Sequence, residues 1–85
     1  MKECAYTIKD PVGIHARPAG FFVKRISEFS SKATIHRGND SCDGKKLLAL
    51  MKLRVKQDET ITVKFEGADE EEACAAALAF LQENF

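Results

Sequence analysis

The sequence has little of what would place it in a specialised protein class. It has no tryptophan and one tyrosine, and none of its apolar runs approaches the ~20 residues that cross a membrane. Its three cysteines, Cys4, Cys42 and Cys74, are an odd number at wide spacing, so they form neither a metal signature nor an obvious disulfide framework. The first residues lack the apolar core of a secretory signal, and we therefore expect a cytoplasmic protein with reduced thiols.

What is present is the composition of a small globular domain. The chain has 85 residues, of which 45% are hydrophobic and 31% charged. There is no repeat, linker or low-complexity segment, so we predict one domain over residues 1–85. The net charge is zero, yet residues 1–57 hold 12 basic and 5 acidic residues, whereas residues 58–85 hold 1 and 8. This asymmetry predicts a basic face around His15 that steers acidic partners, or simply solvated surface charge.

One segment, residues 10–20, contains two prolines, two glycines, a histidine and an arginine. Proline suits the first turn of a helix, so Pro18 predicts a helix that begins near Ala16 to Pro18. The backbone N–H groups at a helix start are unpaired, and together with the helix dipole they form a site for an anion.

Two side chains of this segment suit phosphoryl chemistry. A neutral histidine such as His15 is a nucleophile that can form a covalent intermediate. Arg17 carries a planar fork of donors that matches phosphate oxygens. The residues therefore predict phosphoryl transfer on His15. The alternative is an ordinary surface histidine, because helix starts bind anions without further chemistry.

Alternation and helical spacing predict four strands and three helices. The strands are expected at Lys2–Lys9, Lys32–Arg37, Asp40–Asp43 and Thr60–Glu66, and the helices at Ala19–Phe29, Lys45–Leu53 and after Gly67. Each strand has one apolar face, so the helices should all cover that face and leave the other to solvent. The predicted fold is an α+β open-faced sandwich, and the pattern alone also fits a ferredoxin-like arrangement.

Each predicted helix has a distinctive surface. The first has one apolar stripe, formed by Ala19, Phe22, Val23, Ile26 and Phe29. The second has more large apolar residues than one stripe can bury, so Leu47 and Leu48 are candidates for an exposed patch, unless the small domain buries them all. The third should begin with a capping box formed by Asp69 and Glu72.

The segment Gly13-Ile14-His15-Ala16-Arg17-Pro18-Ala19 closely resembles the active-site signature of the histidine-containing phosphocarrier (HPr) family. The segment from Phe65 to Glu70, which leads into the last helix, also resembles this family, as does the chain length. The resemblance implies four antiparallel strands in the order 1-4-2-3 with three helices on one face. It also implies a carrier of phosphoryl groups in the bacterial phosphoenolpyruvate:sugar phosphotransferase system.

Carried over residue by residue, the resemblance implies that His15 is phosphorylated on Nδ1. It implies that Arg17 balances the charge of the phosphoryl group and that the backbone near Ala16 to Pro18 donates N–H groups to it. Such a protein is a carrier with a phosphohistidine intermediate rather than an enzyme that turns over alone, and it needs no cofactor or metal.

The resemblance also implies partners. Enzyme I would donate the phosphoryl group and sugar-specific IIA domains would accept it. The residues that match partner-binding positions of the family are Gly20, Lys24, Leu47, Leu48 and Met51. We expect a monomer that binds no nucleic acid and does not insert into membranes.

Three positions depart from the family pattern. Lys46 stands where many members have a regulatory serine at the start of the second helix, and a lysine cannot accept that phosphate. Arg54 and Asp58 stand where glycine is usual, so the exit from the second helix and any partner that contacts it are open questions.

Two other functions compete with the carrier. One is an HPr-like regulator whose phosphorylation signals to a protein partner. The other is a ferredoxin-like nucleic-acid-binding module, which would need aromatic side chains on the open face of the sheet. The outward positions of the predicted strands, such as Thr34, Thr60, Thr62 and Lys64, offer none.

Overall fold

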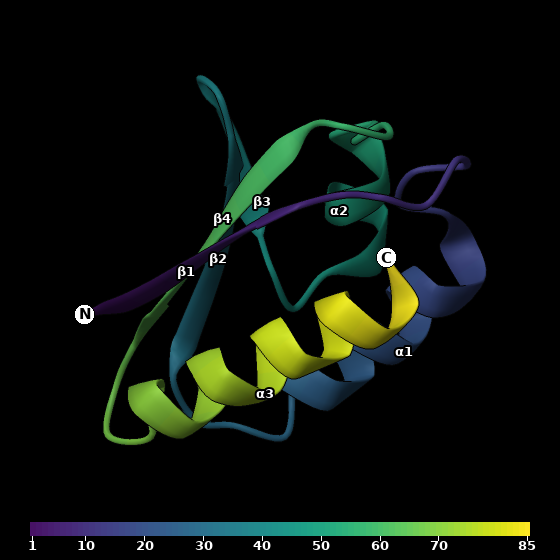
Figure 1. The fold of residues 1–85 in the computed structure, drawn as a ribbon. Coiled ribbons are helices and arrows are strands. Elements are labelled where there is room, and N and C mark those ends of the chain that lie inside the picture. The colour runs from purple at the N-terminus through teal and green to yellow at the C-terminus, as the bar shows by residue number, and fades with distance from the viewer.

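A computed structural model describes all residues of the chain, 1–85, as four strands and three helices (Figure 1). The elements follow in the order β1 (Lys2–Thr7), α1 (Ala16–Ile26), β2 (Lys32–Arg37), β3 (Asp40–Asp43), α2 (Leu47–Lys52), β4 (Thr60–Glu66) and α3 (Glu70–Asn84). None of the three helices combines the length and the hydrophobicity that a membrane crossing requires.

The four strands form one antiparallel sheet in the order β1-β4-β2-β3. β4 is one of its two inner strands, and Val63 of β4 pairs with Cys4 of β1 on one side and with Ile35 of β2 on the other. The predicted order 1-4-2-3 is thus confirmed, and it separates this fold from the ferredoxin-like alternative.

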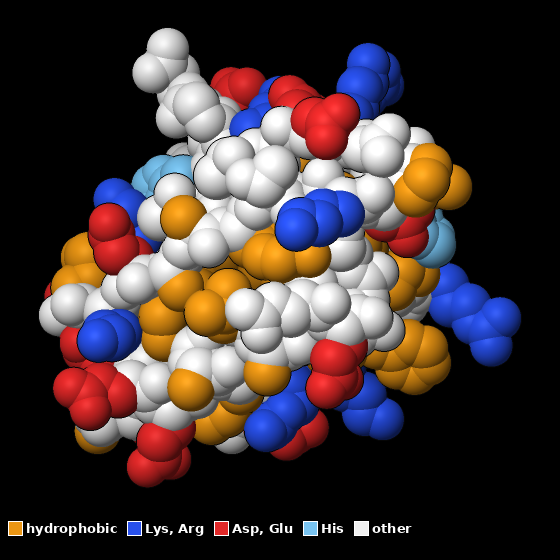
Figure 2. All heavy atoms as spheres, viewed as in Figure 1, with side chains coloured by type: hydrophobic (Ala, Val, Ile, Leu, Met, Phe, Trp, Pro, Cys, Tyr) orange, Lys and Arg blue, Asp and Glu red, His pale blue; other side chains and the backbone are white.

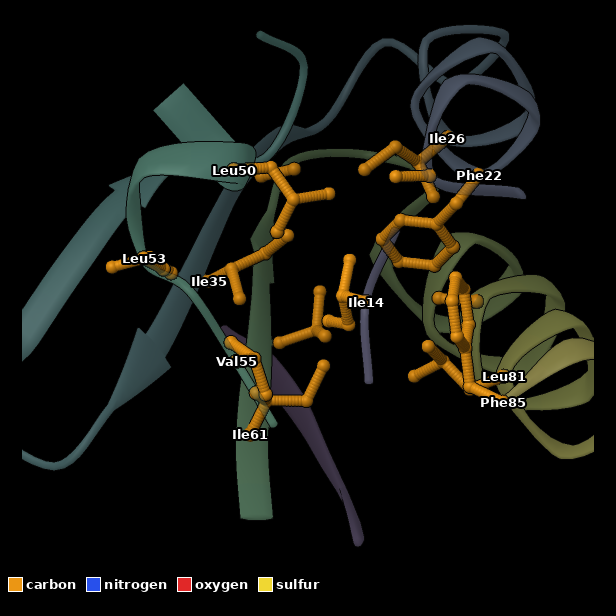
Figure 3. Packing of buried hydrophobic residues seen from close by; sticks show 14 of the residues in the cluster. Ile14, Phe22, Ile26, Ile35, Leu50, Leu53, Val55, Ile61, Leu81 and Phe85 are labelled. Atoms are coloured by element: carbon orange, nitrogen blue, oxygen red, sulfur yellow. The ribbon is translucent and has the colours of Figure 1, made fainter. Parts of the chain in front are cut away.

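The core lies between the sheet and the helices. Ile61, Val63 and Phe65 of β4 are fully buried, whereas the alternate residues of the strand face the other side. Figure 3 shows that side chains of all three helices converge on this face, Phe22 and Ile26 from α1, Leu50 from α2, and Leu81 from α3. The helices therefore cover one face of the sheet, as the alternation in the strands predicts.

Two elements end earlier than predicted because local hydrogen bonds end them. α1 stops at Ile26, and the following residues form a tighter turn in which the N–H of Phe29 donates to the carbonyl of Ile26 at 3.2 Å. β1 stops at Thr7, because the N–H of Lys9 leaves the sheet and donates to the main-chain oxygen of Phe85 at 2.6 Å. Phe29 and Ile8 still pack in or against the core, as predicted.

α2 is shorter at both ends than the predicted Lys45–Leu53. The carboxylate of Asp43 accepts the N–H of Lys45 at 2.9 Å, and its carbonyl accepts the N–H of Lys46 at 3.2 Å. This turn delays the helix until Leu47 and makes Lys46 its N-cap. Leu50 and Leu53 are buried, while Leu48 is exposed, so the alternative in which all the apolar residues of α2 are buried is wrong.

The predicted capping box at the start of α3 is also wrong. Asp69 is the N-cap, but its carboxylate makes no bond to the helix. It accepts instead the N–H groups of Ser30 and Ser31, at 2.8 and 2.9 Å, and the hydroxyl of Ser31. These bonds join the turn before α3 to the turn after α1 and hold the pKa of Asp69 at about 2, chiefly through the Ser31 hydroxyl.

The two positions where glycine is usual in the family keep a glycine-like backbone. Arg54 has φ 51° and Asp58 has φ 71°, both in the left-handed region. The left-handed conformation costs an ordinary residue about 1–2 kcal/mol. The exit from α2 therefore has the expected geometry despite the substitutions.

Candidate functional site

The loop between β1 and α1 presents His15 at the start of α1. His15 is the N-cap, with an extended backbone (φ −117°, ψ 162°) and no hydrogen bond from its side chain to the helix. Behind it the loop is anchored, because Ile14 is buried and its N–H donates to the carbonyl of Val55 at 3.0 Å. The imidazole therefore remains on the surface, with 39% of its side chain exposed.

Gly13 allows the loop between β1 and α1 to lie close to the backbone of Val55. Its φ is +77°, and a Cβ at this position would lie 2.5 Å from the carbonyl oxygen of Val55. Only glycine accepts both this backbone conformation and this contact without a shift of the loop. Gly13 thus sets the distance between the His15 loop and the segment that follows α2.

The imidazole of His15 has two neighbours. Its Nε2 lies 3.3 Å from Oδ2 of Asp10, and its ring meets that of Phe85 edge-to-face, with 6.1 Å between the centroids. The other ring nitrogen, Nδ1, has no hydrogen-bond partner within the protein. One side of the ring is therefore held, and one nitrogen is free to react.

The helix start beside His15 offers free donors. The N–H groups of Ala16 and Arg17 lie in the first turn of α1, where no preceding helical carbonyl can accept them, and Pro18 has no N–H. The guanidinium of Arg17 is exposed and makes no hydrogen bond or ion pair with another residue. Backbone and side chain thus present unpaired donors that suit a dianionic phosphoryl group.

The structure places the five predicted partner-binding residues on α1 and α2, two helices that contact each other. A Cβ on Gly20 of α1 would lie 3.9 Å from Cδ2 of Leu47 of α2, so the two helices are in contact there. Lys24 and Met51 each follow one turn later on the same helix faces. Leu48 beside them is 77% exposed.

Two other apolar side chains are exposed. Sequence reasoning did not assign Val12, whereas the position of Phe21 off the apolar stripe of the first helix predicts that it is either partly exposed or packed at the edge of the core, and it is exposed. Val12 of the His15 loop is 70% exposed and Phe21 of α1 is 57% exposed. Figure 2 shows that acidic side chains gather over the start of α3, at the lower left, while basic ones project around the side that carries α1. The side of the molecule that carries α1 therefore combines exposed apolar side chains with basic ones.

Other potential sites are poor in reactive groups. No three His, Cys, Asp or Glu residues gather as they would around a metal ion. The three thiols are free, and burial, followed by the neighbouring Cys74, raises the pKa of Cys4 to about 12. His36 lies on the open face of the sheet in a shallow hollow beside Thr34 and Lys64, away from the helices.

Comparison with known proteins decides the family. The family model described as "PTS HPr component phosphorylation site" matches residues 2–83. The chain belongs to the HPr family. The phosphocarrier protein HPr of Mycoplasma genitalium is 43% identical over 86 residues, which cover 99% of this chain and 97% of that protein.

Similarity to solved structures supports the same family assignment. A solved structure of the histidine-containing phosphocarrier protein from Mycoplasma has a TM-score of 0.93 at 30% identity and covers 96% of this chain and 93% of that one. The HPr-like protein Crh of Halalkalibacterium halodurans is 35% identical over 96% of this chain and 98% of its own length. The predicted function, an HPr phosphocarrier of the phosphotransferase system, is thus confirmed, and the alternative of an HPr-like regulator has less support.

Sequence reasoning missed the two neighbours of His15. Asp10 carries a detectable signal, because an aspartate followed by Pro11 and Val12 is typical of a turn in which the carboxylate accepts a nearby N–H. Phe85 carries none, since it lies at the far end of α3 and meets His15 only in the folded chain.

Proposed function

We propose that His15 accepts a phosphoryl group from enzyme I and passes it to sugar-specific IIA domains. The observation that supports this most strongly is the arrangement at the start of α1. A surface imidazole with an unpartnered Nδ1 precedes the free N–H groups of Ala16 and Arg17 in the first turn of α1, and the guanidinium of Arg17 is exposed and unpaired.

The chemistry needs little from the carrier itself. The lone pair of Nδ1 forms a bond to phosphorus while the bond between phosphorus and the donor breaks, and the electron pair of that bond leaves with the donor. The N–H groups and Arg17 stabilise the charge on the phosphoryl oxygens, and the partner supplies the remaining positioning. The protein thus carries a covalent phosphohistidine, needs no cofactor or metal, and does not turn over alone.

The same end of the molecule suits rapid exchange of partners. We propose that Gly20, Leu47, Leu48 and Met51 form the apolar centre of the docking surface and that Lys24 lies at its basic rim. A small apolar patch with exposed charges favours fast, salt-dependent and weak association, which a carrier that alternates between two partners requires. On this proposal the protein acts in the cytoplasm as a monomeric single domain, and it uses neither nucleic acid nor membrane.

Transfer in two steps tests the proposal and separates it from the regulatory alternative. The protein is incubated with enzyme I and labelled phosphoenolpyruvate, repurified, and mixed with a IIA domain. We expect label on the protein after the first step and on the IIA domain after the second, and none without enzyme I. Label that enters the protein but cannot be passed to any IIA domain tested would favour the regulator.

A further inference from the structure

We propose that Asp10 is a positioning residue for phosphoryl transfer, because its carboxylate holds the Nε2–H of His15 and leaves the lone pair of Nδ1 as the nucleophile. This inference rests on the proposed function of His15 and assigns a role to a residue outside the signature segment. The observation that supports it is the distance of 3.3 Å between Oδ2 of Asp10 and Nε2 of His15.

The carboxylate of Asp10 is held in place before it meets the imidazole. Its Oδ1 accepts the N–H of Val12 at 2.8 Å, which closes a tight turn. The N–H of Asp10 donates to the main-chain oxygen of Phe85 at 2.8 Å, and its carbonyl accepts the N–H of Gly13 at 2.9 Å. With one oxygen and both backbone groups engaged, only Oδ2 remains to face His15.

Asp10 can only accept a hydrogen bond here. The N–H of Val12 and, to a smaller extent, the bond to His15 hold the pKa of Asp10 below its usual value, so the group is a carboxylate at neutral pH. A carboxylate has no proton to donate. Nε2 must therefore carry the hydrogen of the neutral imidazole, and the lone pair must lie on Nδ1.

The same contact serves the phosphorylated form. When Nδ1 bonds to phosphorus, the ring keeps its Nε2–H and becomes positively charged. The Asp10 carboxylate already faces that charge and needs no rearrangement, while the phosphoryl group lies on the opposite side of the ring from it. Asp10 thus orients the nucleophile before the transfer and balances the positive charge of the ring afterwards.

The Asp10→Asn variant reverses the hydrogen bond without removing the turn. The N–H of Val12 needs an acceptor, so it keeps the single amide oxygen and directs the NH2 group of the asparagine towards His15. That donor requires a lone pair on Nε2 and thereby favours the tautomer protonated on Nδ1. Asp10→Ser is a second variant, whose hydroxyl can close the same turn but is too short to hold the imidazole.

Asp43→Asn is the matched control. Asp43 closes the same kind of turn, accepting the N–H of Lys45 at 2.9 Å, but it faces no histidine. Its substitution should preserve both the tautomer of His15 and the transfer rate. Any general effect of exchanging a turn aspartate for asparagine would appear in both variants.

The decisive readout is the position of the ring proton, measured by 15N NMR of His15 at a pH where the imidazole is neutral. We expect the wild type to be protonated on Nε2, and the fraction protonated on Nδ1 to rise roughly three- to tenfold in Asp10→Asn. Transfer from enzyme I should fall about tenfold in Asp10→Asn, as for other residues that orient a reacting group, and also fall in Asp10→Ser.

An unchanged tautomer ratio in Asp10→Asn, or an unchanged transfer rate in the two folded Asp10 variants, would overturn the assignment. Amide fingerprint spectra identify the folded variants. The NMR measurement needs no partner, so it tests the role of Asp10 even if enzyme I does not phosphorylate this protein, which would instead refute the proposed function.

Discussion

The carboxylate of Asp69 and Ser31, 38 residues apart in the sequence, form the connection that closes one end of the molecule. Oδ1 of Asp69 accepts both the backbone N–H and the hydroxyl of Ser31, while Oδ2 accepts the N–H of Ser30. The neighbouring Gly67 leaves no room for change, because a Cβ there would lie 2.7 Å from Cα of Ser31. The turn before α3 and the turn after α1 are therefore one unit.

This connection predicts a loss of stability in acid. The pKa of Asp69 is about 2 in the folded protein, against 3.8 for an ordinary aspartate, so ionised Asp69 stabilises the fold. Because the folded pKa is the lower one, this stabilisation is complete above about pH 4 and disappears as the pH falls towards 2. In urea unfolding, Asp69→Asn should lower the free energy of unfolding at pH 7 and should weaken its pH dependence between pH 4 and 2.

Glu72→Gln is the control for this prediction. Glu72 would be the second member of a capping box, but its side chain makes no hydrogen bond in the structure. We expect a clearly smaller loss for Glu72→Gln than for Asp69→Asn, limited to the interaction of its charge with the helix dipole. Equal losses for the two variants would show that the capping box exists and that the bonds to Ser30 and Ser31 do not contribute.

Glycine at position 54 or 58 should stabilise the protein. The side chains of Arg54 and Asp58 make no hydrogen bond, yet both residues have positive φ. Relief of this strain exceeds the extra chain entropy of glycine, so we expect Arg54→Gly to add about 0.5–1 kcal/mol. Asp58→Gly should add less, because aspartate tolerates the left-handed region better than arginine.

Thermal unfolding measures whether Arg54→Gly stabilises the protein more than Asp58→Gly does. A gain of 1 kcal/mol raises the Tm of a domain of this size by about 4–8 °C. Ala49→Gly, inside α2, is the control and should cost about 1 kcal/mol, because glycine is a poor helix former. A fall in Tm for Arg54→Gly as large as that for Ala49→Gly would contradict the claim of strain.

The elements and the position of His15 at the start of a helix could be predicted from local patterns, whereas long-range side-chain contacts could not. The alternation of Ile61, Val63 and Phe65 identifies β4, and Pro18 places the start of α1 beside His15. In contrast, the carboxylate of Asp69 bonds to the turn after α1 and not to its own helix, α3. The two turns are far apart in the sequence, so this contact exists only in the folded chain. The position of Phe85 against His15 has the same origin.

Sequence patterns also could not predict which strands are neighbours or where every helix begins and ends. Alternation says which face of each strand is buried but not which strands are neighbours, so the order 1-4-2-3 depended on the family resemblance. The start of α2 is set by the turn at Asp43, whose carboxylate and carbonyl hold the two lysines before Leu47. Helical spacing of apolar residues extends through such a turn and therefore overestimates the helix.

Arg17 and Lys24 should contribute differently to phosphotransfer. Arg17 lies in the first turn of α1 beside His15, whereas Lys24 lies about two turns further along the same helix. Arg17→Ala removes a donor from the reacting group and should slow transfer by about 10–100-fold. Lys24→Ala removes a rim charge and should slow it by only about two- to threefold, with the difference vanishing at high salt.

Initial rates of transfer from enzyme I at low and high salt measure both effects. The His36→Ala variant, altered on the open face of the sheet, serves as the control and should transfer at the wild-type rate. Equal losses for Arg17→Ala and Lys24→Ala at both salt concentrations would refute this division of roles.

The protein should not respond to a kinase that phosphorylates serine at the start of the second helix. Lys46 is the N-cap of α2, where it removes the acceptor and adds a positive charge. A phosphate there would instead add a charge of about −1.5 to −2 beside Leu47 and Leu48 and oppose an acidic partner. Ser41, on β3, is the nearest serine and has strand rather than helix-start geometry.

Peptide mapping after incubation with an HPr kinase and ATP tests this. We expect no phosphoserine in residues 40–54 and an unchanged rate of transfer from enzyme I. Stoichiometric phosphoserine in that range, together with slower transfer, would show that another serine has taken over the regulatory role.

The central claim is that His15 alone carries the phosphoryl group, and the intact mass of the protein after reaction with enzyme I and phosphoenolpyruvate tests it most directly. The wild type and His36→Ala should each gain the mass of one phosphoryl group and lose it in acid, as a phosphohistidine does, while His15→Ala should gain none. Acid-labile phosphate on folded His15→Ala, or its absence from His36→Ala alone, would contradict the account.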